Sequence, residues 1–144
     1  MKDNMLGGVV IYSSMRTGSN YLVSLLNQFQ GVVCHGEIFN PSFVGLREDY
    51  YAKLEITRDD SAKRDSDVNR FYDAVLERDN LRTLVGFKLF PGHDRNILTR
   101  TLTDPSLAKI ILQRDLLTSF ISLCQAEASG IWMIRGGNEQ TQSS

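Results

Sequence analysis

Four short apolar runs recur along the chain and are separated by longer, mostly polar segments. Within each run the apolar residues are consecutive rather than alternating, which is typical of strands covered on both faces. The runs predict β-strands over residues 9–12, 32–35, 83–89 and 108–112.

Between these runs, apolar residues recur three and four positions apart, which is the spacing of an amphipathic helix. Residues 57–67 instead carry charges of both signs, so they are predicted to form a solvated loop or an exposed helix. Strands that alternate with helices predict an α/β fold of three layers, in which a parallel sheet of about four strands is flanked by helices. The predicted helices cover residues 22–29, 44–54, 68–76, 94–102 and 117–128.

Length and charge narrow the class of protein. A chain of 144 residues with a net charge of −1 predicts one α/β domain over residues 1–135 and a flexible polar tail over residues 136–144. The near-zero charge disfavours nucleic acid or a membrane surface as partner. No apolar run approaches the ~20 residues of a membrane span, and no export signal is recognisable, so we expect a soluble cytoplasmic protein. Cys34 and Cys124 lie in apolar stretches and are expected to be buried, reduced thiols.

The segment Ser13–Asn20 lies between the first predicted strand and the first predicted helix. The first N–H groups of a helix lack partners within the helix, and the helix dipole places partial positive charge there. Arg16 adds a forked cationic donor that suits phosphate or sulfate. A Walker A loop would need a lysine directly after Gly18, where this chain has Ser19, so a nucleoside triphosphate is disfavoured.

The carboxyl ends of the predicted strands carry further polar side chains. Ligands of open parallel sheets bind beyond this edge. The ends of the four strands carry one charged residue each, namely Arg16, Glu37, Lys88 and Arg114, so we expect all four side chains at the same edge.

Two segments of the chain resemble the sulfotransferases that use 3′-phosphoadenosine 5′-phosphosulfate (PAPS). The first is Arg16-Thr17-Gly18-Ser19-Asn20, which is similar to the family's 5′-phosphosulfate loop. The second is a strand that ends in Arg114 and is followed by Ser122 eight residues later, which resembles the family's 3′-phosphate site. The resemblance implies a P-loop-like sulfotransferase core, PAPS as cofactor, and no metal.

Two further segments resemble the bacterial sulfotransferases of the trehalose-sulfating type. They are residues 35–41, which include Gly36-Glu37, and residues 86–90 with His93 beyond them. The resemblance implies that Glu37 is the general base, with His93 as the second candidate and His35 as the third. Lys88 would stabilise charge on the leaving phosphate. The acceptor would be a hydroxyl compound, such as a carbohydrate or a glycolipid.

Other interpretations of the same residues stay open. Arg16 and Arg114 also suit a role in surface ion pairs. Glu37 also suits a cap of the segment that follows it, and Lys88 also suits a solvated position at the end of a strand. Family members are usually longer, and the additional part normally carries a cofactor loop. The sequence therefore also fits a non-catalytic module that binds PAPS or 3′-phosphoadenosine 5′-phosphate (PAP), or a P-loop-like phosphotransferase. Helix faces left uncovered by the missing part would favour a homodimer.

Overall fold

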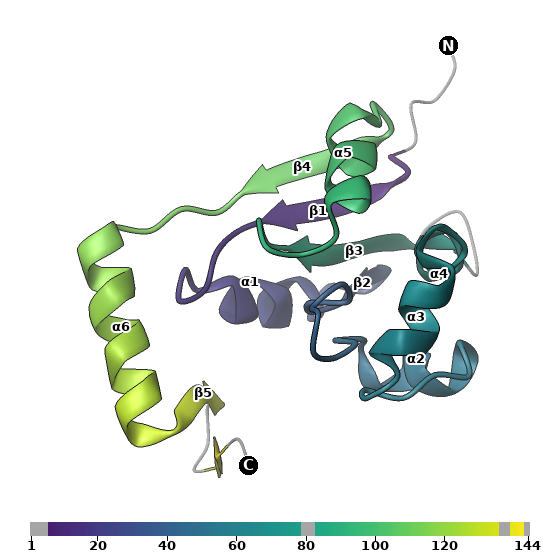
Figure 1. The fold of residues 1–144 in the computed structure, drawn as a ribbon. Helices are drawn as coiled ribbons and strands as arrows, with labels where there is room; N and C mark the ends of the chain where they lie inside the picture. The colour runs from purple at the N-terminus through teal and green to yellow at the C-terminus, as the bar shows by residue number, and fades with distance from the viewer. Residues whose placement is uncertain (1–5, 79–82, 136–138, 143–144) are drawn as a thin grey trace.

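A computed structural model describes residues 6–78, 83–135 and 139–142. Four parallel strands form its central sheet in the order β2-β3-β1-β4 (Figure 1). This arrangement confirms the predicted α/β class with a four-stranded parallel sheet flanked by helices. The strands are β1 (Gly8–Tyr12), β2 (Val32–Cys34), β3 (Leu84–Leu89) and β4 (Leu107–Ile111).

The helices connect these strands and then continue beyond the sheet. Each predicted helix is present, although α1 begins and ends three residues earlier than its apolar stripe suggests and α2 is shorter than predicted. The helices are α1 (Ser19–Leu26), α2 (Glu48–Lys53), α3 (Ser61–Ser66), α4 (Val68–Leu76), α5 (Arg95–Thr103) and α6 (Leu116–Ser129).

The strand order defines where a site can form. The crossover from β1 to β2 runs one way along the sheet, whereas those from β2 to β3 and from β3 to β4 run back. With right-handed crossovers, α1 covers one face and the helices before and after β3 cover the other. The connections that leave the adjacent strands β1 and β3 therefore diverge to opposite faces. Such a point in a parallel sheet opens a crevice at its carboxyl edge.

The core lies between the sheet and the helices that flank β3. Phe39 packs its ring against those of Phe71, Tyr72 and Phe87, with centroids 5.6 to 6.5 Å apart. Phe87 and Val85 of β3 are completely buried, as expected for a strand in the interior of a parallel sheet. Gly86 allows close approach of β1, because a Cβ there would lie 2.8 Å from the carbonyl oxygen of Val9.

The charged segment 57–67 is mostly exposed, as predicted, but one of its side chains is buried. It contains α3, and Arg64 of that helix is only 3 % exposed. The guanidinium is buried because it reaches backbone carbonyl groups of another segment, which a charge pattern cannot reveal. The end of the chain also differs from an irregular tail. Strands β5 (Ile131–Arg135) and β6 (Glu139–Gln142) pair antiparallel, while residues 136–138 and 143–144 lie outside the described part.

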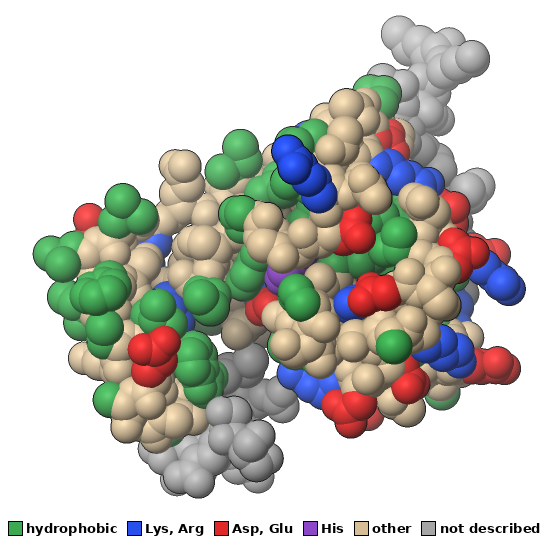
Figure 2. Space-filling view, viewed as in Figure 1, with side chains coloured by type: hydrophobic (Ala, Val, Ile, Leu, Met, Phe, Trp, Pro, Cys, Tyr) green, Lys and Arg blue, Asp and Glu red, His purple; other side chains and the backbone are tan. Residues whose placement is uncertain are grey.

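Helix α6 projects away from the sheet (Figure 1), and apolar side chains gather on its surface (Figure 2). Leu117 and Phe120 are 67 % and 63 % exposed. The expected burial of Cys124 is wrong for the same reason, since the face of α6 that carries it does not pack on the sheet. Cys34 is buried as predicted, and burial raises the pKa of its thiol to about 11. Among the described residues, no helix is long and apolar enough to cross a membrane.

Candidate functional site

The loop between β1 and α1 has an unusual backbone. Arg16 and Gly18 have φ angles of 63° and 85°, so both are left-handed, and Gly18 is the N-cap residue of α1. The hydroxyl of Thr17 donates to the carbonyl oxygen of Ser14 at 2.8 Å, which closes the turn. A loop of this kind directs successive backbone N–H groups to one side, where α1 begins. The loop therefore has the form of an anion-binding cradle.

Arg16 joins this loop to α6. Its Nε atom donates to the hydroxyl oxygen of Ser122 at 3.0 Å, and its Nη1 atom donates to the carbonyl oxygen of Trp132 at 2.6 Å. Arg114 donates from Nη1 to the carbonyl oxygen of Arg16 at 3.0 Å. Asp115 caps α6 by accepting from the N–H of Thr118, which fixes where the helix begins. The structure thus brings together three predicted site residues from two distant segments of the sequence, namely Arg16, Arg114 and Ser122.

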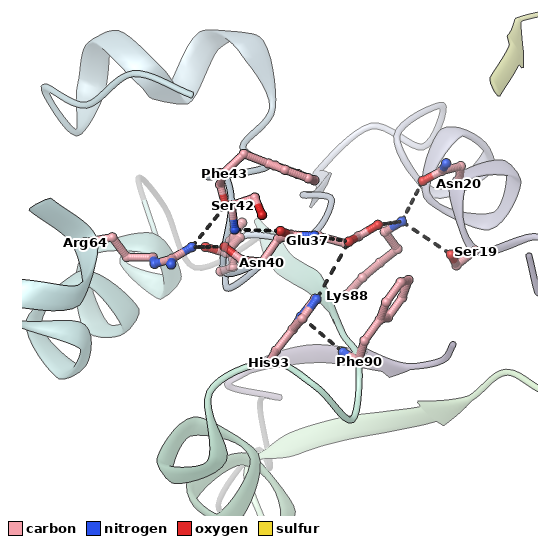
Figure 3. Close-up of polar contacts among 11 residues, drawn as sticks. Ser19, Asn20, Glu37, Asn40, Ser42, Phe43, Arg64, Lys88, Phe90 and His93 are labelled. Atoms are coloured by element: carbon pink, nitrogen blue, oxygen red, sulfur yellow. Dashed lines mark hydrogen bonds and ion pairs between the residues drawn. The ribbon is translucent and has the colours of Figure 1, made fainter. Parts of the chain in front are cut away.

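Lys88 lies at the centre of a second group of side chains, shown in Figure 3. The prediction placed Lys88 at the end of its strand, and it is the penultimate residue of β3 and only 1 % exposed. Its Nζ atom donates to Oδ1 of Asn20 at 2.5 Å, to Oε1 of Glu37 at 3.2 Å and to the hydroxyl of Ser19 at 3.3 Å. Burial lowers the pKa of Lys88, whereas the charge of Glu37 opposes that change. Lys88 is therefore not a solvated strand end.

Glu37 follows β2 and is held on both carboxylate oxygens. Its Oε2 atom accepts from Nδ2 of Asn40 at 2.8 Å and lies 3.7 Å from Nε2 of His93. Burial alone would raise the pKa of Glu37, but the nearby His93, the hydrogen bond from Asn40 and the charge of Lys88 outweigh it and lower the pKa to about 2. The carboxylate is consequently ionised at neutral pH. A Cβ on Gly45 would lie 2.7 Å from the Glu37 nitrogen, so the backbone here is tightly packed.

His93 has an orientation that bears on its role. Its Nδ1 atom accepts the backbone N–H of Phe90 at 3.2 Å, and its ring stacks on that of Phe90 with centroids 5.0 Å apart. A neutral imidazole that accepts at Nδ1 carries its proton on Nε2. The Nε2 atom faces Glu37, so this arrangement makes His93 a donor to Glu37 rather than an acceptor of a proton.

His35 belongs to the core. It is fully buried, its Nδ1 atom accepts the N–H of Arg47 at 3.0 Å, and its ring meets the ring of Tyr50 edge-on at 4.5 Å. Burial, aided by the charge of Arg47, lowers its pKa to about 4. These contacts give His35 a role in packing, and they involve other residues than those that contact the Glu37 carboxylate.

The two groups of side chains meet at the β1–α1 loop. Arg16 faces the first group with Arg114 and Ser122, while Asn20 faces the second group with Lys88 and Glu37. A mainly apolar hollow of about 280 Å³ is lined by Leu98 of α5 and by residues that end or follow β1, β3 and β4, Phe90 among them. Another hollow, of about 370 Å³, lies beside β2 and α2. Neither hollow is lined by a predicted site residue.

Sequence reasoning gave Asn40 no role of its own and included it only in the segment of residues 35–41. The offset of three residues from Glu37 was the available signal, since a turn of that length brings the two side chains together.

Comparison of the chain with protein-family models, curated proteins and solved structures gives no significant match. The function is therefore inferred from the chemistry of the site.

Proposed function

We propose that this chain is a PAPS-dependent sulfotransferase with a P-loop-like core, acting on a hydroxyl acceptor such as a carbohydrate or a glycolipid. One observation carries the proposal. The β1–α1 loop has Arg16 beside Arg114 and Ser122, and the first turn of α1 directly after it has Asn20 beside Lys88, which also bonds Glu37. PAPS has two anionic groups, a 5′-phosphosulfate and a 3′-phosphate. The loop with Lys88 suits the first group, and Arg114 with Ser122 suits the second.

The residues provide what sulfuryl transfer requires. The acceptor oxygen forms a bond to sulfur, and the bond from sulfur to the bridging oxygen breaks, so the products are a sulfate ester and PAP. The acceptor proton passes to the carboxylate of Glu37, which His93 and Asn40 orient. Lys88 and the loop N–H groups stabilise the negative charge that develops on the leaving phosphate. Catalysis then consists mainly of alignment and charge stabilisation.

Calorimetry with PAP tests the cofactor assignment. Wild-type protein is expected to bind PAP, and Arg114→Ala to bind it about 10- to 100-fold more weakly, as the loss of a charged hydrogen bond implies. Arg70→Ala is the matched control, because Arg70 is an exposed arginine on α4. Absence of binding by the wild type would overturn the proposal.

Turnover of labelled PAPS tests the catalytic assignment. Glu37→Gln is expected to lower the transfer rate by about 10²- to 10⁴-fold, the range typical of a lost general base, while PAP still binds. PAP binding by the wild type without turnover over a broad panel of acceptors would instead identify a non-catalytic PAP-binding module.

A phosphotransferase is the second candidate, and Lys88 is the observation that favours it. The loop lacks the Walker lysine in sequence, but the Nζ atom of Lys88 reaches the first turn of α1 from β3. An ammonium group at that place suits phosphate as well as sulfate. Calorimetry with ATP and Mg²⁺ separates the two functions, since tight binding of ATP with weak binding of PAP would favour phosphoryl transfer.

A further inference from the structure

Arg64 is a buried cation that the proposed reaction does not use. It lies on α3 with its side chain 2 % exposed, and its Nε atom contacts Oδ1 of Asp65 at 2.7 Å. The Asp65 side chain is 55 % exposed, so the ion pair leaves one partner in water. Burying a guanidinium beside so exposed a carboxylate is unfavourable unless other acceptors compensate.

The compensating acceptors are three backbone carbonyl groups of one turn (Figure 3). Nη1 of Arg64 donates to the carbonyl oxygens of Ile38 at 3.0 Å, Asn40 at 2.8 Å and Phe43 at 3.0 Å. These residues belong to the segment that begins at Glu37. A planar guanidinium can serve several carbonyl groups in one place, because its donors have a fixed geometry.

Within this turn, Asn40 connects the backbone to the carboxylate. Its Oδ1 atom accepts the N–H of Ser42 at 2.9 Å, so the amide is oriented with Nδ2 outward. Nδ2 then donates to Oε2 of Glu37 at 2.8 Å. The carbonyl of Asn40 is the closest of the three acceptors of Arg64. A continuous set of hydrogen bonds thus runs from Arg64 through Asn40 to Glu37.

We propose that Arg64 is a positioning residue for Glu37: it holds the turn of residues 37–43 in the shape that directs the Asn40 amide onto the Glu37 carboxylate. The consequence for sulfuryl transfer rests on the proposed function. The positioning itself does not, because it concerns contacts within this chain. In this account Asn40 keeps one carboxylate oxygen engaged, and Lys88 keeps the other.

The side-chain amide of Asn40 is the direct reporter. In the ¹⁵N-labelled full chain at pH 7, the Nδ2 proton bonded to Glu37 is expected to be shifted downfield and protected from exchange. Arg64→Gln is expected to reduce that protection about tenfold or more in the folded protein. Arg58→Gln is the matched control, because the exposed Arg58 guanidinium lies 4.1 Å from the centroid of the Phe43 ring of the same turn and, among the contacts of the described residues, does not bond the carbonyls of that turn. A folded Arg64→Gln protein with the wild-type Asn40 signal would overturn the proposal.

A double-mutant cycle on Arg64 and Asn40 distinguishes a positioning role of Arg64 from general stabilisation of the fold. Arg64→Gln and Asn40→Ala are each expected to lower kcat about tenfold with PAP affinity unchanged, and the double variant to lose no more than Asn40→Ala alone. Additive losses would overturn the proposal. If Arg64→Gln does not fold, Arg64→Lys keeps the buried charge without the fork and is measured in the same way. If the wild type shows no turnover, the proposed function fails, while the Asn40 signal still decides the role of Arg64.

Discussion

The ammonium nitrogen of Lys88 lies 3.2 Å from a carboxylate oxygen of Glu37, and the two side chains are only 2 % and 19 % exposed. Lys88 belongs to β3, and Glu37 follows the neighbouring strand β2, which pairs with β3 in parallel. Because both side chains are largely shielded from water, each charge is stabilised mainly by the other. Asn20 links this pair to the β1–α1 loop, so a change in either charge is expected to affect the loop as well.

Replacing Lys88 by Met is expected to weaken both PAP binding and the fold. The Glu37 carboxylate would remain buried without its cation, which raises the pKa of Glu37 and destabilises the protein by up to about 3 kcal/mol. Urea unfolding at pH 7 measures the stability, and calorimetry measures the affinity. Lys109→Met is the control, since Lys109 of β4 contacts only carbonyl oxygens of Asp104 and Leu107 among the contacts described. Equal stability of the two variants would contradict this prediction.

Replacing Ser122 by Ala is expected to weaken binding of PAP by about five- to tenfold, the effect of one lost hydrogen bond. The effect should vanish with adenosine 5′-phosphosulfate, which has no 3′-phosphate. Ser129→Ala is the control on the same helix, because the hydroxyl of Ser129 donates to the Gln125 carbonyl at the far end of α6. A similar loss with both ligands would place Ser122 against a different part of the cofactor.

The free energy of unfolding is expected to fall in mild acid because of His35. Burial lowers the pKa of His35 from 6.5 to about 4, so the unfolded chain binds the proton more tightly. The stabilising contribution is complete above pH 6.5 and is lost as the pH falls towards 4, at up to about 1.4 kcal/mol per pH unit. Urea unfolding at a series of pH values measures this slope.

His35→Asn is the matched variant, since its amide oxygen can accept the N–H of Arg47 without titrating. Its stability should change little over the same pH range. Glu37 acts in a lower window, because its pKa is lowered from 4.5 to about 2 and its contribution is lost only as the pH falls through that range. A slope in His35→Asn as steep as in the wild type would assign the effect to other groups.

The uncovered surface of α6 predicts self-association. Exposed Leu116, Leu117 and Phe120 form an apolar patch that is favourable to bury. Sedimentation velocity at increasing concentration should show a dimer, and Phe120→Glu should shift the protein towards the monomer without loss of helix content. A wild-type protein that stays monomeric at high concentration would refute the homodimer expectation.

The sequence was informative where local pattern decides structure. The apolar runs located all four strands of the central sheet. The charged residues at the ends of these runs were expected at one edge of the sheet, because parallel strands have their carboxyl ends on the same side. Arg114 and Ser122 were selected through a resemblance, because their separation of eight residues is that of the 3′-phosphate site in PAPS-dependent sulfotransferases.

The contacts that the sequence did not reveal join distant segments. Arg64 lies in a charged stretch, and nothing in that stretch indicates that carbonyl groups more than twenty positions earlier will bury its guanidinium. The exposure of Cys124 was missed because an apolar stripe gives the face of a helix but not whether another element covers that face. Tertiary packing settles both cases.

The left-handed backbone of Arg16 has a thermodynamic consequence for the whole protein. A residue with a Cβ loses roughly 1–2 kcal/mol in that conformation, whereas glycine does not. A chain optimised only for stability would have glycine at this position, and it would then lack the guanidinium that reaches α6. If the loop binds an anion as proposed, part of the ordering cost of that site is already met in the folded chain, at the expense of roughly 1–2 kcal/mol of stability.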